Sequence, residues 1–213
     1  ATGNGSIPLQ GVAGNAKGGA NIGVTLRENT VVAAGGTGSV TLDGTLTTAD
    51  YYDVASSILG NGQNGGVSIS AASIVQSGVG ATTGGGGITV TGRGPFDGTG
   101  ASSTPQLFGV RIAGGSLVES VAGGAIVISG DVRDARTAGL QGVQITGSSS
   151  VLGHTGNVSI TGIGGGANRA DADAVLIDSG GVVATSSGNI SMTGSFISFA
   201  NPNGQYLGGV TLA

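Results

Sequence analysis

A short motif recurs along this chain and constrains its fold more than any other feature. Written G-x-φ-x-φ-x-G, where φ is an apolar residue, it is GNVSITG from Gly156 and GNISMTG from Gly188, 32 residues later. Three further copies are GSVTLDG from Gly38, GGITVTG from Gly86 and GAIVISG from Gly124. Because a motif that returns at a near-regular interval indicates a repeat architecture, the fold is expected to consist of stacked copies of one unit.

Each repeat carries two further apolar units at nearly fixed offsets from this motif. The first is an apolar-x-apolar pair that begins at Val24, Val67, Val110, Val143, Val175 and Val210. The second is a valine eight residues after each of the first five starts, at Val32, Val75, Val118, Val151 and Val183. Every repeat therefore contains three short apolar units followed by a segment of variable length.

The residues of these units favour short β-strands. Apolar positions alternate with Thr, Ser, Gln or Arg, which is the period of two expected of a half-buried strand. All four prolines lie between the units, where no ladder N–H is needed. A glycine on both sides of a three- or four-residue strand is interpreted as a corner at each end, since glycine tolerates positive φ. The sequence therefore predicts an all-β, right-handed parallel β-helix of about five to six coils, with three short strands per coil and variable loops.

An antiparallel β-sandwich is the alternative all-β fold. Its signal would be Asn-Gly hairpin turns between paired strands, but the Asn-Gly pairs at Asn4, Asn61 and Asn203 lie only in variable segments. Residues 1–213 are accordingly expected to form a single β-helix domain, a segment of a longer repeat array.

Composition limits the classes of function. Only 8% of residues are charged and the formal net charge is -4, which argues against a nucleic-acid surface. The absence of cysteine excludes disulfides, thiol catalysis and cysteine-based zinc sites. No run of 18 or more apolar residues occurs, so no transmembrane helix is predicted.

The variable segments, 43–66, 91–109, 129–142, 161–174 and 193–209, hold most of the candidate contact residues. The aromatic rings could form a sugar-binding platform or cover the outside of the coil: Tyr51, Tyr52, Phe96, Phe108, Phe196, Phe199 and Tyr206. Loop carboxylates could hold calcium or be solvated: Asp50, Asp53, Asp131, Asp134, Asp171, Asp173 and Asp178. The single histidine, His154, lies at a corner, and no nearby residue is singled out as a nucleophile. No catalytic, cofactor-binding or metal-binding residue is therefore assigned, and the chain is not expected to be an enzyme.

The repeat units GSVTLDG, GNVSITG and GNISMTG, with the intervening GVxI…SxV pattern, resemble the β-helical shafts of large bacterial secreted adhesins of the filamentous-haemagglutinin and autotransporter type. The resemblance covers most of residues 22–213, and NPNGQYLGG from Asn201 is similar to a stretch found in the secretion domains of such exoproteins. It implies an extracellular or cell-surface rod that holds a binding region away from a bacterial cell.

Three functions are therefore considered. The first is a structural or adhesive segment whose partners are surface glycans or proteins, contacted through the variable loops. The second is a carbohydrate-active β-helix lyase or hydrolase. The third is a self-assembling fibre or surface-layer unit, whose partners are further copies of itself.

Overall fold

The protein folds into three parallel β-sheets, which we call A, B and C. The computed structural model describes residues 3–14, 21–47, 63–94, 107–133, 140–165, 172–196 and 207–213. Sheet A contains β1 (Ile7–Ala13), β4 (Val40–Leu46), β7 (Ile88–Arg93), β10 (Ile126–Asp131), β13 (Val158–Gly164) and β16 (Ile190–Phe196). Sheet B contains β2 (Ile22–Leu26), β5 (Asn64–Ile69), β8 (Leu107–Ile112), β11 (Leu140–Ile145), β14 (Ala172–Ile177) and β17 (Leu207–Leu212). Sheet C contains β3 (Val31–Gly35), β6 (Ile74–Val79), β9 (Leu117–Ser120), β12 (Ser150–Leu152) and β15 (Val182–Ala184).

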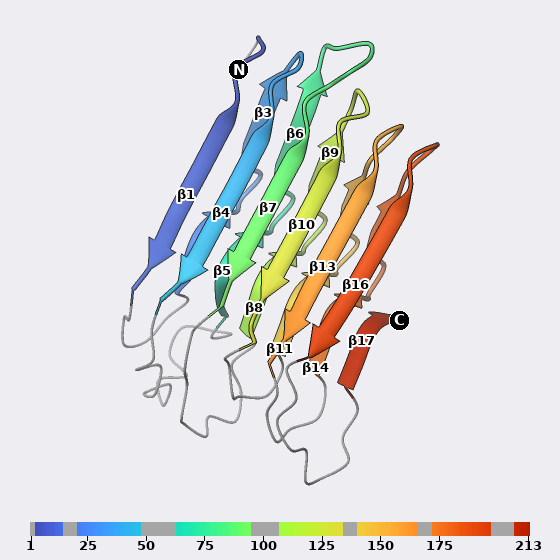
Figure 1. Ribbon diagram of the computed structural model, residues 1–213. Helices are drawn as coiled ribbons and strands as arrows, with labels where there is room; N and C mark the ends of the chain where they lie inside the picture. Colours follow the sequence, from blue (N-terminus) through green and yellow to red (C-terminus); the bar gives the residue numbers. More distant parts are fainter. Residues whose placement is uncertain are drawn as a thin grey trace, which may run out of the picture.

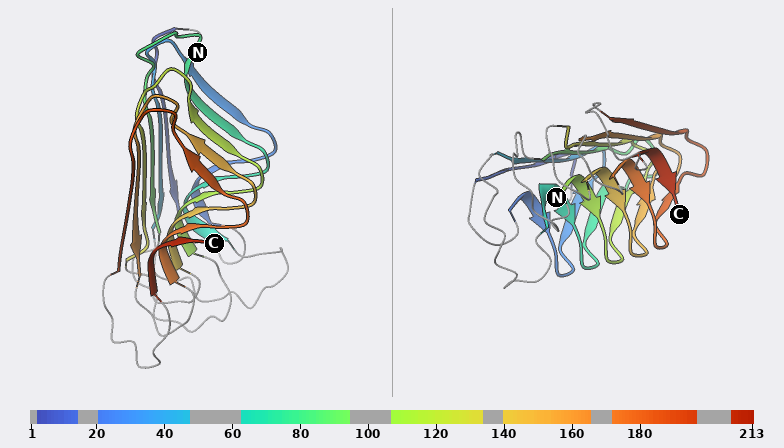
Figure 2. Two further views of the ribbon diagram at one scale, coloured as in Figure 1. Left: turned by 90° about the vertical axis from the view of Figure 1, so that its right-hand side faces the viewer. Right: turned by 90° about the horizontal axis from the view of Figure 1, so that it is seen from below.

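The chain passes through sheets A, B and C in turn, so each strand pairs in parallel with the equivalent strand of the next coil. Sheet A descends at the front of Figure 1 and sheet B returns behind it while the coils advance from β1 to β16, which makes the winding right-handed. The left view in Figure 2 looks along the stack and shows equivalent strands one behind another, with each coil displaced from the next. The predicted right-handed parallel β-helix is confirmed, and the antiparallel sandwich is excluded for the described strands.

The core consists of the predicted apolar columns. Val24, Val67 and Val110 are register partners in sheet B, and Val75, Val118 and Val151 are register partners in sheet C. All of these valines except Val24, which is 8% exposed, are fully buried. Burying an aliphatic side chain of this size stabilises the fold by roughly 1.5–3 kcal/mol before chain entropy is subtracted, so stacking of coils supplies the stability.

The variable segments all join a strand of sheet A to the next strand of sheet B. The B-to-C connections, in contrast, have four residues in every coil, and the C-to-A connections have four or five, except for the eight residues between β6 and β7. Most of the variation in length is therefore at the A-to-B corner, and insertions leave the solenoid at its corners, as expected for a repeat protein whose coils must keep their register.

The interpretation of the closing glycine of the motif as a corner is wrong. Gly44, Gly92, Gly130 and Gly162 lie inside the strands of sheet A, which are six or seven residues long, and are partners in one register column. A Cβ added to Gly130 would lie 1.8 Å from the backbone oxygen of Gly142 on sheet B. These glycines are needed because the backbones of sheets A and B touch there, and the strands of sheet A have no room for a side chain at this position.

The opening glycines do lie at a corner, between sheets C and A, but without positive φ. A Cβ on Gly124 would lie 2.1 Å from the backbone oxygen of Gly86, its equivalent one coil earlier. Close approach of successive coils, rather than a left-handed backbone, therefore requires glycine here.

Left-handed backbone recurs most regularly at the corner between sheets B and C, although single residues of the C-to-A corner, such as Gly123 and His154, also adopt it. Two consecutive residues of the B-to-C corner have φ between 48° and 79° in every coil: Glu28 and Asn29, Ala71 and Ala72, Gly114 and Gly115, Gly147 and Ser148, and Ser179 and Gly180. Each non-glycine residue in this conformation costs about 1 kcal/mol or more. Hydrogen bonds between coils offset this cost: Ala72 N donates to the Gly114 oxygen over 2.8 Å, and the buried Ser116 N donates to Ser149 Oγ over 3.1 Å.

Candidate functional site

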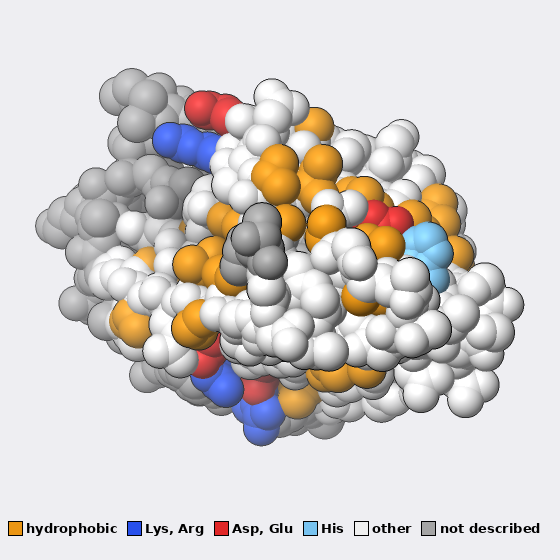
Figure 3. Space-filling model, turned by 90° about the horizontal axis from the view of Figure 1, so that it is seen from above, with side chains coloured by type: hydrophobic (Ala, Val, Ile, Leu, Met, Phe, Trp, Pro, Cys, Tyr) orange, Lys and Arg blue, Asp and Glu red, His pale blue; other side chains and the backbone are white. Residues whose placement is uncertain are grey.

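His154 takes part in a polar cluster on the outer side of sheet C. It lies at the corner after β12 with φ of 47°. Its Nε2 is 2.7 Å from Oε1 of Glu119, and Oε2 of Glu119 accepts a hydrogen bond of 2.6 Å from Nε2 of Gln76. Figure 3 shows the histidine beside a carboxylate on a surface that also carries apolar side chains. Because Gln76, Glu119 and His154 come from three successive coils, the cluster ties these coils together.

The cluster holds its carboxylate ionised. Burial alone raises the pKa of Glu119, but the hydrogen bonds from His154 and Gln76, with the charge of His154, outweigh burial and lower this pKa overall. Thr185 Oγ1 donates to the backbone oxygen of His154 and not to its ring. Among the described residues no hydroxyl is hydrogen-bonded to the imidazole, so this part of the chain contains no Ser-His-Asp arrangement.

The predicted acidic candidates are dispersed. Asp173 accepts a hydrogen bond from Thr211 Oγ1, and Asp131 accepts one of 2.8 Å from Nε of Arg133. Asp178 lies at the turn after β14, where its backbone oxygen accepts from Gly181 N. Within the described ranges no group of three or more acidic or histidine side chains could hold a metal ion. Four candidates lie outside those ranges: Asp50, Asp53, Asp134 and Asp171.

Two of the seven aromatic candidates lie in the described part of the chain, Phe108 and Phe196. Phe108 is fully buried, and its ring lies over Gly65 on the outer side of sheet B, where a Cβ would be 2.4 Å from ring carbons. Phe196 packs against a small apolar cluster that includes Leu107 and Leu140. Neither ring forms an exposed platform, and the packing alternative holds for Phe108. The other candidates lie outside the described residues: Tyr51, Tyr52, Phe96, Phe199 and Tyr206.

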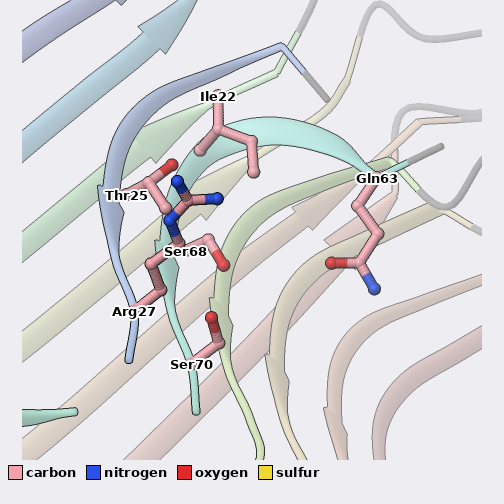
Figure 4. Close-up of a pocket in the computed structure, with 6 residues that line it drawn as sticks. All are labelled: Ile22, Thr25, Arg27, Gln63, Ser68 and Ser70. Carbon is pink, nitrogen blue, oxygen red and sulfur yellow. The ribbon is translucent and has the colours of Figure 1, made fainter. Parts of the chain in front are cut away.

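A pocket that the sequence analysis did not identify lies on the outer face of sheet B. We call it the sheet B pocket. It has a volume of about 520 Å³, and the described residues that line it are Ile22, Thr25, Arg27, Gln63, Ser68 and Ser70 (Figure 4). Thr25 and Ser68 are register partners on β2 and β5, whereas Gln63 precedes β5 and Arg27 follows β2. The volume falls in the usual range of small-ligand sites, roughly 300–1,000 Å³.

The described residues that line the sheet B pocket carry a positive charge and no negative charge. Its described lining includes three hydroxyls, one amide, one guanidinium and no carboxylate. In Figure 4 the Arg27 guanidinium extends alongside Thr25 and Ser68. Nε of Arg27 is 3.6 Å from Oε1 of Glu28, but their side chains are 71% and 79% exposed, so the pair contributes little. The pocket can therefore accept an anionic, hydroxyl-bearing group.

Sequence reasoning missed both Glu119 and this pocket. The repeat alignment contains a signal for Glu119. Glu119 and Leu152 share one outward column, and His154 follows Leu152 by two residues. The pocket had no such signal, since Thr25 and Ser68 are ordinary outward strand residues.

The described residues include no helix of the length and apolarity needed to cross a membrane. No family model, curated protein sequence or solved structure matches the chain.

Proposed function

We propose that this chain is a structural segment of a large extracellular or cell-surface bacterial protein, in which the β-helix serves as a spacer rod and carries adhesive contacts. The observation that supports this proposal most is the separation of a constant core from variable connections. Successive coils place their strands in the same sheets in register, and most of the variation in length lies at the corner between sheets A and B. A scaffold of this kind can gain coils without changing its cross-section, which is what a spacer requires.

Electron cryo-microscopy of the intact parent protein tests the proposal. An extended rod is expected, with length increasing by roughly 4.8 Å for each coil in its sequence. A compact, capped particle with a deep polar cleft would contradict it.

A self-assembling fibre unit is the second candidate. It is favoured by apolar side chains that strands of sheets A and C expose along the coil, since Val31 is 59%, Val127 41% and Val182 44% exposed. Exposed apolar residues promote association between chains. Light scattering distinguishes the candidates, because a fibre unit grows in mass with concentration and a monomeric spacer does not.

A further inference from the structure

The outer face of sheet A carries a regular array of hydroxyl groups. Side chains alternate between the two faces of a strand, so two outward columns run side by side across β4, β7, β10, β13 and β16. Asp43 and Val127 occupy two of the ten positions in these columns. The other eight are Thr or Ser, and we call them the hydroxyl face: Thr41, Thr89, Thr91, Ser129, Ser159, Thr161, Ser191 and Thr193.

The columns of the hydroxyl face are straight. The register of sheet A is unbroken between neighbouring strands from β1 to β16, whereas that of sheet C shifts between Ala33 and Gly35. Figure 1 shows the strands of sheet A side by side, and the left view of Figure 2 shows the sheet edge-on as a nearly flat wall. Equivalent positions are therefore about 4.8 Å apart along a column and about 6.6 Å apart between the two columns.

The hydroxyl groups of this face are available to a partner outside the chain. All eight residues are half-buried or exposed, and in the part of the chain that the structure describes none of their side chains makes a hydrogen bond. Threonine is β-branched, so its χ1 angle is restricted and the array is ordered before anything binds.

The charges at the border of the hydroxyl face cancel. Arg93 Nη1 is 3.5 Å from Asp43 Oδ1, and Arg133 Nε donates to Asp131 Oδ2 over 2.8 Å. No outward residue of the five strands is aromatic, so the face has no ring of the kind that packs against a flat sugar surface. A neutral partner that presents hydrogen-bonding groups on a regular lattice therefore suits this face.

The lattice of ice has spacings close to those of the hydroxyl face. In ice each oxygen is hydrogen-bonded tetrahedrally to four others at about 2.75 Å, so two oxygens that share a neighbour are about 4.5 Å apart. The same bond length and angle give a repeat of about 7.3 Å along the hexagonal axis. Both values differ from the spacings of the face by about 10% or less, so water molecules held by neighbouring hydroxyls lie near lattice positions.

We propose that the hydroxyl face binds ice, through water molecules that its Thr and Ser side chains hold near the positions of the ice lattice. Each contact is a weak hydrogen bond, but many form at once because the face and the lattice share a period. The contact should be strongest over β13 and β16, adjacent strands on which both columns carry hydroxyls. This inference rests on the proposed function, to which it adds a partner, and it places the adhesive contact on a regular sheet.

Partitioning of the full chain into slowly growing ice tests the proposal, with crystalline cellulose as a second solid that presents hydroxyl groups. Thr161→Tyr and Thr89→Tyr are the test variants, because a phenol ring on either column holds the flat face away from a lattice. Thr25→Tyr is the matched control, since it makes the same replacement at an exposed outward position of sheet B. Tyrosine suits a β-strand, so all three variants should unfold at the wild-type temperature.

The wild type is expected to enter the ice and to leave the cellulose unbound. Each test variant should lower the amount of protein in the ice by about fivefold or more, as expected for the loss of at least one hydrogen bond. Thr25→Tyr should change this amount by less than about twofold, the scale of a surface substitution.

Four results would overturn the proposal: exclusion of the wild type from ice, capture by cellulose in preference to ice, unchanged ice binding in both test variants, or an equal loss in Thr25→Tyr. Each of these leaves the rod visible by electron cryo-microscopy, so the failure of the hydroxyl face is distinguishable from the failure of the spacer function.

Discussion

Replacement of Gly130 by alanine should destabilise the solenoid more than its small size suggests. The new Cβ would lie 1.8 Å from the backbone oxygen of Gly142, 2.5 Å from its carbonyl carbon and 2.9 Å from Cγ2 of Val143. Ordinary contact needs about 3.4 Å, and two of these atoms belong to the backbone of β11, which is hydrogen-bonded to β8 and β14. No change of rotamer can relieve the overlap, so sheets A and B must separate. Overpacking costs about 1–3 kcal/mol, and we expect the upper end, about 3 kcal/mol.

Thermal unfolding followed by circular dichroism measures this effect. For a chain of this size, about 3 kcal/mol corresponds to a fall in Tm of roughly 6–12 °C. Gly209→Ala is the matched control, since it lies on sheet B opposite the same column and its Cβ would meet nothing closer than 3.4 Å. Sheet B already has an alanine at the equivalent position, Ala174, in the coil before. If Gly130→Ala unfolded within about 1 °C of the wild type, the close contact of the two backbones would be refuted.

Three further predictions, one of them with its control substitution, concern the core, a buried hydroxyl and the Glu119 carboxylate. Ile128→Ala removes a fully buried side chain and should lower the free energy of unfolding by about 2–5 kcal/mol, whereas Val127→Ala, 41% exposed, should change it by less than about 0.5 kcal/mol; urea titration compares the two. Ser116→Ala removes a buried hydroxyl that donates to the Ala113 oxygen over 2.7 Å and accepts from Ser73 N over 3.2 Å, so a loss of about 1–3 kcal/mol is expected in the same titration. No loss would contradict a stabilising role for these two hydrogen bonds. Glu119→Gln tests the lowered pKa of Glu119. Because the pKa of Glu119 is lower in the folded than in the unfolded chain, its ionised carboxylate stabilises the fold above the ordinary glutamate pKa of about 4.3, and the wild type should have a higher Tm than the variant there. This difference in Tm should disappear as the pH falls through the folded pKa. A difference in Tm that stayed constant with pH would rule out the contribution of the ionised carboxylate and its bond to His154.

The apolar columns were predictable because an inward residue must stack on its copy one coil later. Val67 and Val110, for example, are 43 residues apart in sequence and are register partners in sheet B. The period alone gives this pairing, since a shift of one residue would turn every apolar side chain toward solvent.

The role of the glycines was not predictable in the same way. A glycine at a corner and a glycine inside a strand look alike in a sequence, and only the approach of another backbone distinguishes them. Gly130 faces Gly142, and the two belong to different sheets whose separation depends on every residue between them. The left-handed backbone at the corner between sheets B and C was not predictable either, because residues such as Glu28 and Ala71 occupy positions where glycine would be expected.

The candidate site was less predictable than the fold. A search for aromatic rings and carboxylates in variable segments directed attention away from the sheets, although Thr25, Arg27 and Ser68 of the pocket lie on regular strands or just beyond them. Their proximity depends on the registration of coils 43 residues apart, and no short motif marks it.

The uneven lengths of the coils determine how far the chain extends as each coil unfolds under a force applied at its two ends. A folded coil advances the axis by only one strand spacing, roughly 4.8 Å. The coil from Val24 to Val67 contains 43 residues and that from Val143 to Val175 contains 32, so full extension releases roughly 140 Å and 105 Å respectively. Coils that unfold one at a time would therefore lengthen a tether in unequal steps, and the lengths of the connecting segments would set the size of each step.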